Sequence, residues 1–246
     1  MSYFVTGGTG FIGRFLIGNL LKRKGSIHVL VRKASLKKFA ALAKKMDWDP
    51  KRVVAVTGDM TAPKCGLTAA QIRTLSAKKI QHFFHLAAIY DMTASAESQR
   101  AANIDGTQHA LDLAAALKAG CFHHTSSIAA AGMYPGVFRE DMFEEAEGLD
   151  DPYLRTKHDS EGLVRDETRI KWRIYRPGIR RPARWTRSTA RTISSPSSRS
   201  CAKCCRRGCR RWAWKAGAST WCRWISWSTR WTTSRTSPNL TGIPST

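Results

Sequence analysis

Tyr153 and Lys157 are the residues of this sequence whose types and spacing best suit proton transfer. Positions i and i+4 share one face of a helix, so the phenol and the ammonium are expected to point the same way. A nearby ammonium lowers the pKa of a phenol and makes it a usable acid or base near neutral pH. Upstream, Thr125, Ser126 and Ser127 end a strand pattern and can supply a hydroxyl that polarises a carbonyl. A Tyr-x-x-x-Lys pair alone is common by chance, so its weight depends on the motifs around it.

A glycine-rich turn lies near the start of the chain, where Gly7, Gly10 and Gly13 are spaced three apart between a strand pattern and a helix pattern. A tight turn with a bare backbone lets a pyrophosphate approach the helix N-terminus, where free N–H groups and the helix dipole favour an anion. The strand–turn–helix context favours dinucleotide binding over a merely tight turn. The other predicted cofactor contacts in this turn are Thr9, Phe11 and Ile12.

The end of the second predicted strand bears on the choice of cofactor. An acidic residue there would hydrogen-bond the ribose hydroxyls and repel a 2′-phosphate. The chain instead has Arg32 and Lys33 with no carboxylate nearby. Arg32 can pair with a phosphate, so the sequence favours NADPH, with NADH as the alternative; Arg32 could also be a solvated charge at a strand end.

Two further strand ends are expected to line the same cleft. The third predicted strand is followed by Asp59 and Met60, and the fourth by Ala87 and Ala88. Asp59 could accept a hydrogen bond from the adenine amino group, or could serve only its own turn. The small Ala87 and Ala88 would let the cofactor lie against the backbone.

Strand and helix patterns alternate through residues 1–179, which predicts an α/β doubly wound parallel sheet, the Rossmann fold. Six strands are expected, at 3–6, 27–31, 53–57, 82–86, 121–126 and 172–175. The helices between them are expected at 11–24, 36–46, 68–79, 95–119 and 152–167.

Seven segments together resemble the extended short-chain dehydrogenase/reductase family, which includes NAD-dependent epimerases and dehydratases. They are FVTGGTGFIG, GDMTAP, FHLAA, NIDGT, FHHTSSIAAAG, YLRTK and YRPG. Within that family the chain looks most similar to the branch related to thioester and fatty acyl-CoA reductases. The resemblance covers residues 1 to about 179 and implies hydride transfer between NADPH and a carbonyl or alcohol carbon.

The resemblance also implies roles for individual residues. Ser127 would be the catalytic hydroxyl, because it precedes Gly132 by the family's usual spacing, and Ser126 is the weaker candidate. Tyr153 would be the proton donor or acceptor. Lys157 would bind the nicotinamide ribose and tune Tyr153.

Three more residues take roles from the resemblance. Asn103 would support a proton relay through water, and Pro177 and Gly178 would flank the nicotinamide. Three histidines have no partner pattern and are expected in the core or on a strand surface rather than as ligands: His85, His123 and His124. No metal site is predicted.

Two other functions stay open alongside the NAD(P)-dependent oxidoreductase, whose substrate could be an acyl thioester or lipid-like. One is a sugar epimerase or dehydratase of the same family, which uses NAD transiently. The other is a non-catalytic dinucleotide-binding remnant with a polyanion-binding tail.

The composition changes sharply near residue 179. The chain carries a net charge of +23, but residues 180–246 hold 15 Lys and Arg and no Asp or Glu. Seven of the nine Trp and five of the seven Cys also lie after Gly178. The family resemblance stops at the same point, so residues 1–179 are predicted to form the dinucleotide-binding domain and 180–246 a basic, disordered tail.

An Arg-, Trp-, Ser- and Cys-rich stretch is what a GC-rich gene gives when read out of frame. Shifted by one base, with free choice of third bases, the tail can be re-read as a segment with helical and strand periodicity. We therefore hypothesise a frameshift between residues 179 and 184, which would remove the substrate lobe and weaken turnover. The alternatives are nonspecific polyanion or membrane-surface binding and a zinc site, which is disfavoured because no second pair follows the cysteines. Those cysteines are Cys201, Cys204, Cys205 and Cys209.

No apolar run approaches the roughly 18 residues that a membrane span needs. The N-terminus also lacks the basic segment of a signal peptide. We expect a cytoplasmic protein that binds a small-molecule substrate, with no specific nucleic-acid partner.

Overall fold

The computed structural model describes residues 1–89 and 94–178 of the chain. Its six strands form one parallel sheet in the order β3-β2-β1-β4-β5-β6. The strands are β1 (Ser2–Thr6), β2 (Ser26–Val31), β3 (Val53–Thr57), β4 (Ile80–His85), β5 (Cys121–Thr125) and β6 (Trp172–Tyr175). The order steps outward from β1 in both directions, which confirms the predicted doubly wound Rossmann fold.

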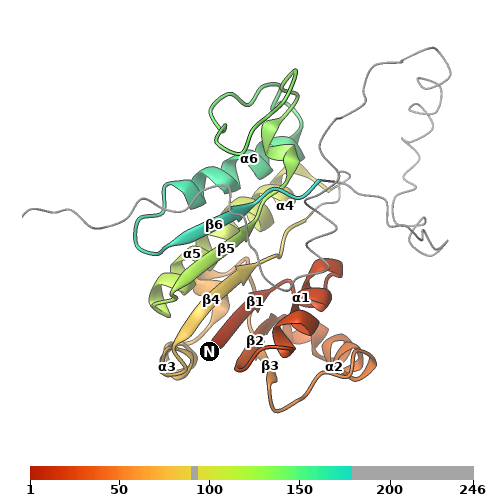
Figure 1. Ribbon diagram of the computed structural model, residues 1–246, viewed down its shortest axis with the longest axis vertical. Coiled ribbons are helices and arrows are strands. Elements are labelled where there is room, and N and C mark those ends of the chain that lie inside the picture. Colours follow the sequence, from red (N-terminus) through yellow and green to blue (C-terminus); the bar gives the residue numbers. More distant parts are fainter. Residues whose placement is uncertain (90–93, 179–246) are drawn as a thin grey trace, which may run out of the picture. The chain divides into compact units, whose positions relative to one another are not determined.

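Helices connect the strands and lie on both sides of the sheet (Figure 1). They are α1 (Phe11–Leu21), α2 (Leu36–Lys45), α3 (Ala69–Ala77), α4 (Ala96–Arg100), α5 (Gly106–Ala116) and α6 (Pro152–Arg165). Most predicted bounds differ from these by one to three residues, because helix ends fray where the apolar pattern gives no sharp stop.

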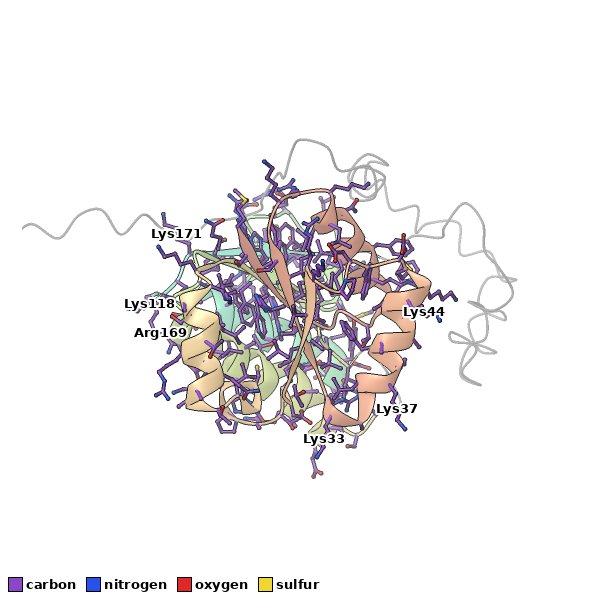
Figure 2. The ribbon with its side chains drawn as sticks, turned by 90° about the horizontal axis from the view of Figure 1, so that it is seen from below. Lys33, Lys37, Lys44, Lys118, Arg169 and Lys171 are labelled. Carbon is purple, nitrogen blue, oxygen red and sulfur yellow. The ribbon has the colours of Figure 1, made fainter. Side chains whose placement is uncertain are left out.

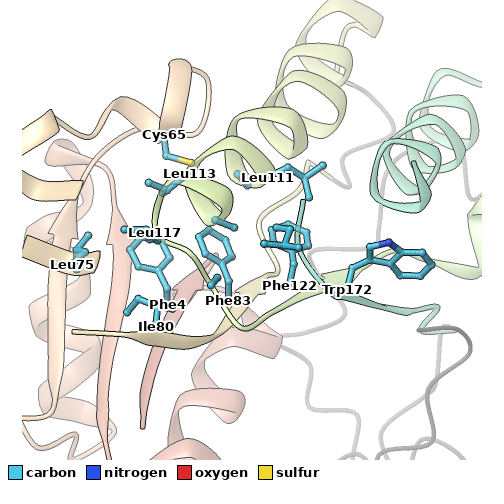
Figure 3. Packing of buried hydrophobic residues seen from close by; sticks show 14 of the residues in the cluster. Phe4, Cys65, Leu75, Ile80, Phe83, Leu111, Leu113, Leu117, Phe122 and Trp172 are labelled. Atoms are coloured by element: carbon cyan, nitrogen blue, oxygen red, sulfur yellow. The ribbon is translucent and has the colours of Figure 1, made fainter. Parts of the chain in front are cut away.

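Successive side chains of each strand point to opposite faces of the sheet, so the core has two layers. Phe4 and Phe83 point to one face of the sheet, where they pack against Leu111 of α5 and Leu75 of α3. Figure 3 shows this layer, in which aromatic side chains of the neighbouring strands β1, β4, β5 and β6 lie side by side under the helices. The alternate residues of β1 point to the other face, where they pack against α1 and α2. Both faces are covered, as a parallel sheet requires.

The predicted long helix at 95–119 is interrupted. Between α4 and α5 the chain forms a π-helical turn, η3 (Ala101–Asp105). Such wide turns often occur at functional sites because they redirect side chains. Here the turn contains the buried Asn103.

The predicted tail, residues 180–246, lies outside the described residues and stays a prediction together with its frameshift, zinc and polyanion alternatives. Within residues 1–89 and 94–178, no helix combines the length and the apolar character needed to cross a membrane.

Candidate active site

The glycine turn between β1 and α1 is closed so tightly that side chains would not fit. Gly7 has a φ of +70°, and a Cβ there would lie 2.7 Å from the backbone nitrogen of Ala87. A Cβ on Gly13 would lie 2.3 Å from the carbonyl oxygen of Gly7. Gly10 caps α1 without any side-chain hydrogen bond, so the first N–H groups of the helix remain available to an anion. The turn therefore fits a dinucleotide pyrophosphate.

The other predicted contacts in this turn lie around the helix start. Thr9 and Ile12 are half-buried, while the ring of Phe11 is 58% exposed. The guanidinium of Arg14 lies 5.0 Å from the centre of the Phe11 ring. Phe11 thus places its backbone N–H at the first position of α1 while its side chain faces outward.

The end of β2 is basic and open to solvent. Arg32 is exposed and leads into the short helical turn η1 (Lys33–Ser35). Within the described residues no ion pair involves Arg32 or Lys33. Figure 2 shows Lys33, Lys37 and Lys44 along this turn and the outer side of α2. An anionic group at this strand end would meet the positive charges of Arg32 and Lys33.

Asp59 follows β3 and organises its own turn. Its Oδ1 accepts hydrogen bonds from the backbone nitrogen of Thr61 at 3.0 Å and from the Thr61 hydroxyl at 2.9 Å. The carbonyl of Met60 accepts from Nδ1 of His109 at 2.9 Å. These contacts show the turn role for Asp59, and the adenine contact stays a prediction.

A buried threonine fixes the chain after β4 against the glycine turn. The Oγ1 of Thr6 accepts from the backbone nitrogens of Leu86 and Ala87 at 3.3 and 3.4 Å, and lies 2.9 Å from Nδ1 of His85. Because the threonine oxygen already accepts twice, its own proton points to Nδ1 and leaves the His85 proton on Nε2. That nitrogen lies 3.2 Å from the hydroxyl of Thr107. No sequence pattern pointed to Thr6 or Thr107, because the contact joins segments far apart in the chain.

The three predicted strand histidines lie in the core, as expected. His85, His123 and His124 are all buried, and the rings of His85 and His124 stack at a centre-to-centre distance of 5.6 Å. Burial, with the added charge of Lys157, lowers the pKa of His124 to about 3. Both histidines of that stack are therefore neutral at physiological pH, since burial also lowers the pKa of His85.

Helix α6 brings Tyr153 and Lys157 to the site. Asp151 caps the helix by accepting from the backbone nitrogens of Tyr153 at 2.8 Å and Leu154 at 3.3 Å. The Tyr153 phenol lies beside the Ser127 side chain, whose oxygen accepts from the backbone nitrogen of Ala129 at 3.1 Å. Lys157 follows one turn later and is only 5% exposed. The three residues predicted as the catalytic set thus converge, two on one helix and one on the loop after β5.

The direction of the Tyr153 pKa differs from the sequence-based expectation. Burial raises the pKa of Tyr153, and the nearby Ser127 hydroxyl acts in the opposite direction. Loss of solvent around a phenolate disfavours the charged form and accounts for the rise. Burial likewise lowers the pKa of Lys157 to about 8, which leaves the ammonium charged at neutral pH.

The structure separates the two adjacent serines after β5. Ser126 is buried and donates to Oε2 of Glu161 at 2.6 Å, whereas Ser127 faces Tyr153. This arrangement favours Ser127 as the hydroxyl available to a substrate. Glu161 itself carried no signal in the sequence.

Asn103 connects two segments of the site by hydrogen bonds. Its Oδ1 accepts from the backbone nitrogen of Ile89 at 2.8 Å, and its Nδ2 donates to the Ile89 carbonyl at 3.0 Å and to the Thr156 hydroxyl at 3.3 Å. These bonds connect the chain after β4 with α6. They give Asn103 a positioning role, and the water relay stays a prediction.

Pro177 contacts the loop that carries Ser127. Its carbonyl accepts from the backbone nitrogen of Ile128, the residue after Ser127, at 3.2 Å. Gly178 follows directly in the chain. The end of β6 is therefore tied to the loop that carries Ser127.

Comparison with known proteins agrees with this geometry. The family described as Male sterility protein (NAD_binding_4) matches residues 5–211. The chain belongs to this family. The matched range of this Male sterility family member continues past Ile179, where the resemblance of the motifs stops.

Its relatives include large biosynthetic enzymes. The chain is 32% identical over 190 residues to a linear gramicidin synthase protein of Brevibacillus parabrevis, covering 71% of this chain and 4% of that protein. It is 29% identical over 179 residues to the fatty acyl-CoA reductase wat of Drosophila melanogaster, covering 62% of this chain and 34% of that protein. The chain therefore spans about a third or less of these two relatives.

Solved structures show the same fold. The terminal R domain from the myxalamid PKS-NRPS biosynthetic pathway superposes with a TM-score of 0.63 at 31% identity, over 72% of this chain and 48% of that one. A UDP-glucuronic acid 4-epimerase from Bacillus cereus in complex with NAD gives a TM-score of 0.57 at 23% identity, over 72% and 56%. The second likeness concerns the fold alone.

Proposed function

We propose that this protein is an NADPH-dependent oxidoreductase that reduces the carbonyl of an acyl thioester or aldehyde, or oxidises the corresponding alcohol. The observation that carries the proposal is the placement of the Tyr153 phenol beside the Ser127 side chain, with Lys157 one helical turn away. A hydroxyl pair that meets beside a buried ammonium suits protonation of a carbonyl oxygen.

Each residue of the set has a distinct task. The Ser127 hydroxyl donates to the substrate oxygen and orients it, and Tyr153 gives that oxygen its proton. The ammonium of Lys157 stabilises the phenolate left behind and would hold the nicotinamide ribose. When bound, the nicotinamide would supply the hydride, so an aldehyde carbonyl, hydride and proton together give the alcohol. With a thioester the same addition gives a hemithioacetal, whose carbon–sulfur bond then breaks as its hydroxyl proton passes to sulfur, releasing an aldehyde and a thiol.

The cofactor proposal rests on two parts of the structure. The tight turn of Gly7, Gly10 and Gly13 fits the pyrophosphate. A Cβ on any of the three would crowd the backbone, so the turn has a bare backbone that a phosphate group can approach closely. The exposed Arg32 provides a positive charge for a 2′-phosphate at the end of β2. A phosphate held by a guanidinium is a charge-assisted contact, which favours NADPH over NADH. Asp59, Met60, Ala87 and Ala88 would line the adenosine side.

The proposed substrate class rests on the relatives. One is named a fatty acyl-CoA reductase, and a solved neighbour at 31% identity is the terminal R domain of a PKS-NRPS pathway. The name fatty acyl-CoA reductase fits a carbonyl substrate activated as a thioester.

The test uses the full chain with NADPH and a long-chain acyl-CoA or its aldehyde. We expect saturable NADPH binding by nicotinamide fluorescence and loss of NADPH absorbance on adding substrate. Tyr153→Phe is expected to bind NADPH normally and to lose roughly 100-fold or more of the turnover, because the proton donor is gone. Tyr134→Phe is the matched control and should keep full activity.

Other outcomes distinguish the alternatives. Undiminished turnover in Tyr153→Phe would show that the assignment of the proton donor is wrong. Oxidised NAD released from the purified protein by acid would indicate an epimerase or dehydratase. Saturable NADPH binding with no turnover of any carbonyl would indicate a non-catalytic binding domain.

A further inference from the structure

Three elements of the site meet at one buried carboxylate. The Glu161 side chain is 0% exposed and accepts from Ser126 at 2.6 Å, at the end of β5. Arg176, at the end of β6, donates to its Oε1 at 2.6 Å. Arg165, one turn further along α6, donates to the same oxygen at 2.7 Å. The carboxylate thus connects β5, α6 and β6.

Two of the three connected segments carry a proposed catalytic residue beside the connection. Ser127 follows Ser126, and Lys157 precedes Glu161 by one helical turn. Successive side chains of an extended chain point to opposite sides, and Ser127 has extended φ and ψ of −159° and 159°. With Ser126 turned toward Glu161, the Ser127 hydroxyl is turned away from it, accepts from the backbone nitrogen of Ala129 at 3.1 Å and lies beside the Tyr153 phenol.

Arg176 extends the connection to the loop that precedes α6. Its Nη2 donates to the carbonyl of Met142 at 2.7 Å and its Nη1 to the carbonyl of Arg139 at 3.2 Å. Its guanidinium also lies 5.0 Å from the centre of the Phe138 ring. The loop that leads to Tyr153 is therefore held by the same group of charges.

The carboxylate of Glu161 is compensated by two guanidiniums, those of Arg165 and Arg176. Burial alone would raise the pKa of Glu161, but hydrogen bonds and the charge of Arg176, with the bonds from Ser126 and Arg165, hold that pKa below its usual value. The carboxyl therefore stays ionised at neutral pH. Removing one partner of a buried ion pair leaves the others without compensation, so the group acts as a unit.

We propose that Glu161 is a positioning residue that, through Ser126, holds the Ser127 hydroxyl against the Tyr153 phenol. The inference rests on the proposed function and adds two residues to it, neither of which touches substrate. The Ser126 hydroxyl is the connection between the buried charge and the catalytic hydroxyl.

The experiment is an NMR measurement on the full chain labelled with ¹³Cζ-tyrosine at neutral pH, with Tyr153→Phe identifying the Tyr153 signal. Ser127→Ala defines how far the Tyr153 signal shifts when the hydroxyl beside the phenol is removed. Ser126→Ala is expected to move the signal in the same direction, and to lower kcat roughly tenfold while the NADPH Kd changes less than twofold. Ser126→Ala keeps every ion pair of the group, so it is expected to fold even where Glu161→Gln does not.

Arg165→Lys is the matched control, because it weakens the ion pair within α6 but keeps the charge and the connection between elements. It should lower the unfolding temperature and leave the Tyr153 signal in place. A Tyr153 signal at the wild-type position in folded Ser126→Ala would overturn the proposal. If the signal moves but the wild type turns over no carbonyl substrate, the positioning stands and the proposed function fails.

Discussion

The amide of Asn103 donates to the hydroxyl of Thr156 at 3.3 Å, across 53 positions of sequence. Thr156 immediately precedes Lys157 on α6, and the same amide holds both backbone groups of Ile89. The π-helical turn, the chain after β4 and the helix of the proposed catalytic pair are therefore fixed by one side chain. The contribution of these hydrogen bonds to stability can be measured by removing the Asn103 side chain.

Asn103→Ala is expected to lower the free energy of unfolding by about 2 kcal/mol, because it leaves buried groups of Ile89 without their partner. Urea denaturation of the full chain measures the change. The control is Asn19→Ala, which removes an exposed hydrogen bond from Lys22 and should cost less than about 0.5 kcal/mol. Equal losses of unfolding free energy in the two variants would show that the buried hydrogen bonds of Asn103 do not stabilise the fold more than an exposed one does.

Gly13→Ala is expected to weaken NADPH binding by roughly tenfold or more, because the new Cβ would lie 2.3 Å from the carbonyl of Gly7 and open the turn. Gly18→Ala, on the same helix, has nothing within 4 Å of the new Cβ. It should keep the NADPH Kd and stabilise α1 by about 0.5–1 kcal/mol. Fluorescence titration and thermal unfolding of both variants provide the comparison. NADPH binding that survives in Gly13→Ala would show that the turn is not the pyrophosphate site.

Arg32→Ala is expected to weaken NADPH binding roughly tenfold and to leave NADH binding unchanged, because only NADPH carries the 2′-phosphate. Competition titrations with the two cofactors measure the ratio of their Kd values. Lys37→Ala removes another exposed positive charge, from the first turn of α2, and should change that ratio little. A ratio that responds equally to both substitutions would indicate general attraction of anions rather than a 2′-phosphate contact.

The buried Lys157 predicts a pH dependence of stability. Burial lowers its pKa from 10.5 to about 8 in the folded chain, so between these values the unfolded chain holds more protons. The free energy of unfolding should therefore rise with pH across this window, by about 3 kcal/mol from this group. Below about pH 8 both states are charged, and the full cost of burying the ammonium remains.

The measurement compares urea denaturation of the wild type and Lys157→Met from about pH 7 to about pH 10.5, which spans the titration of a lysine in both states. Their difference isolates the lysine from other groups that titrate in this range. Lys37→Met, at an exposed position, should follow the wild type throughout. A wild-type profile parallel to that of Lys157→Met would show that Lys157 is not desolvated.

The scaffold follows from the sequence alone. Apolar periods of two and of 3.6 residues are local properties, so they indicated all six strands and their parallel arrangement. The glycine spacing and the interval between Tyr153 and Lys157 are equally local, and the structure has the turn and the helix where these motifs predict them. The break at η3 was missed because the apolar pattern runs through it.

The orientation and the pKa values of the site side chains depend on tertiary packing. Ser126 and Ser127 look alike in sequence, and they differ because Glu161, 35 positions away from Ser126, accepts a hydrogen bond from it. The direction of the Tyr153 pKa also depends on burial, which arises where distant segments pack around the phenol. Desolvation and long-range hydrogen bonds arise when remote segments pack together, so no local pattern of residues encodes them.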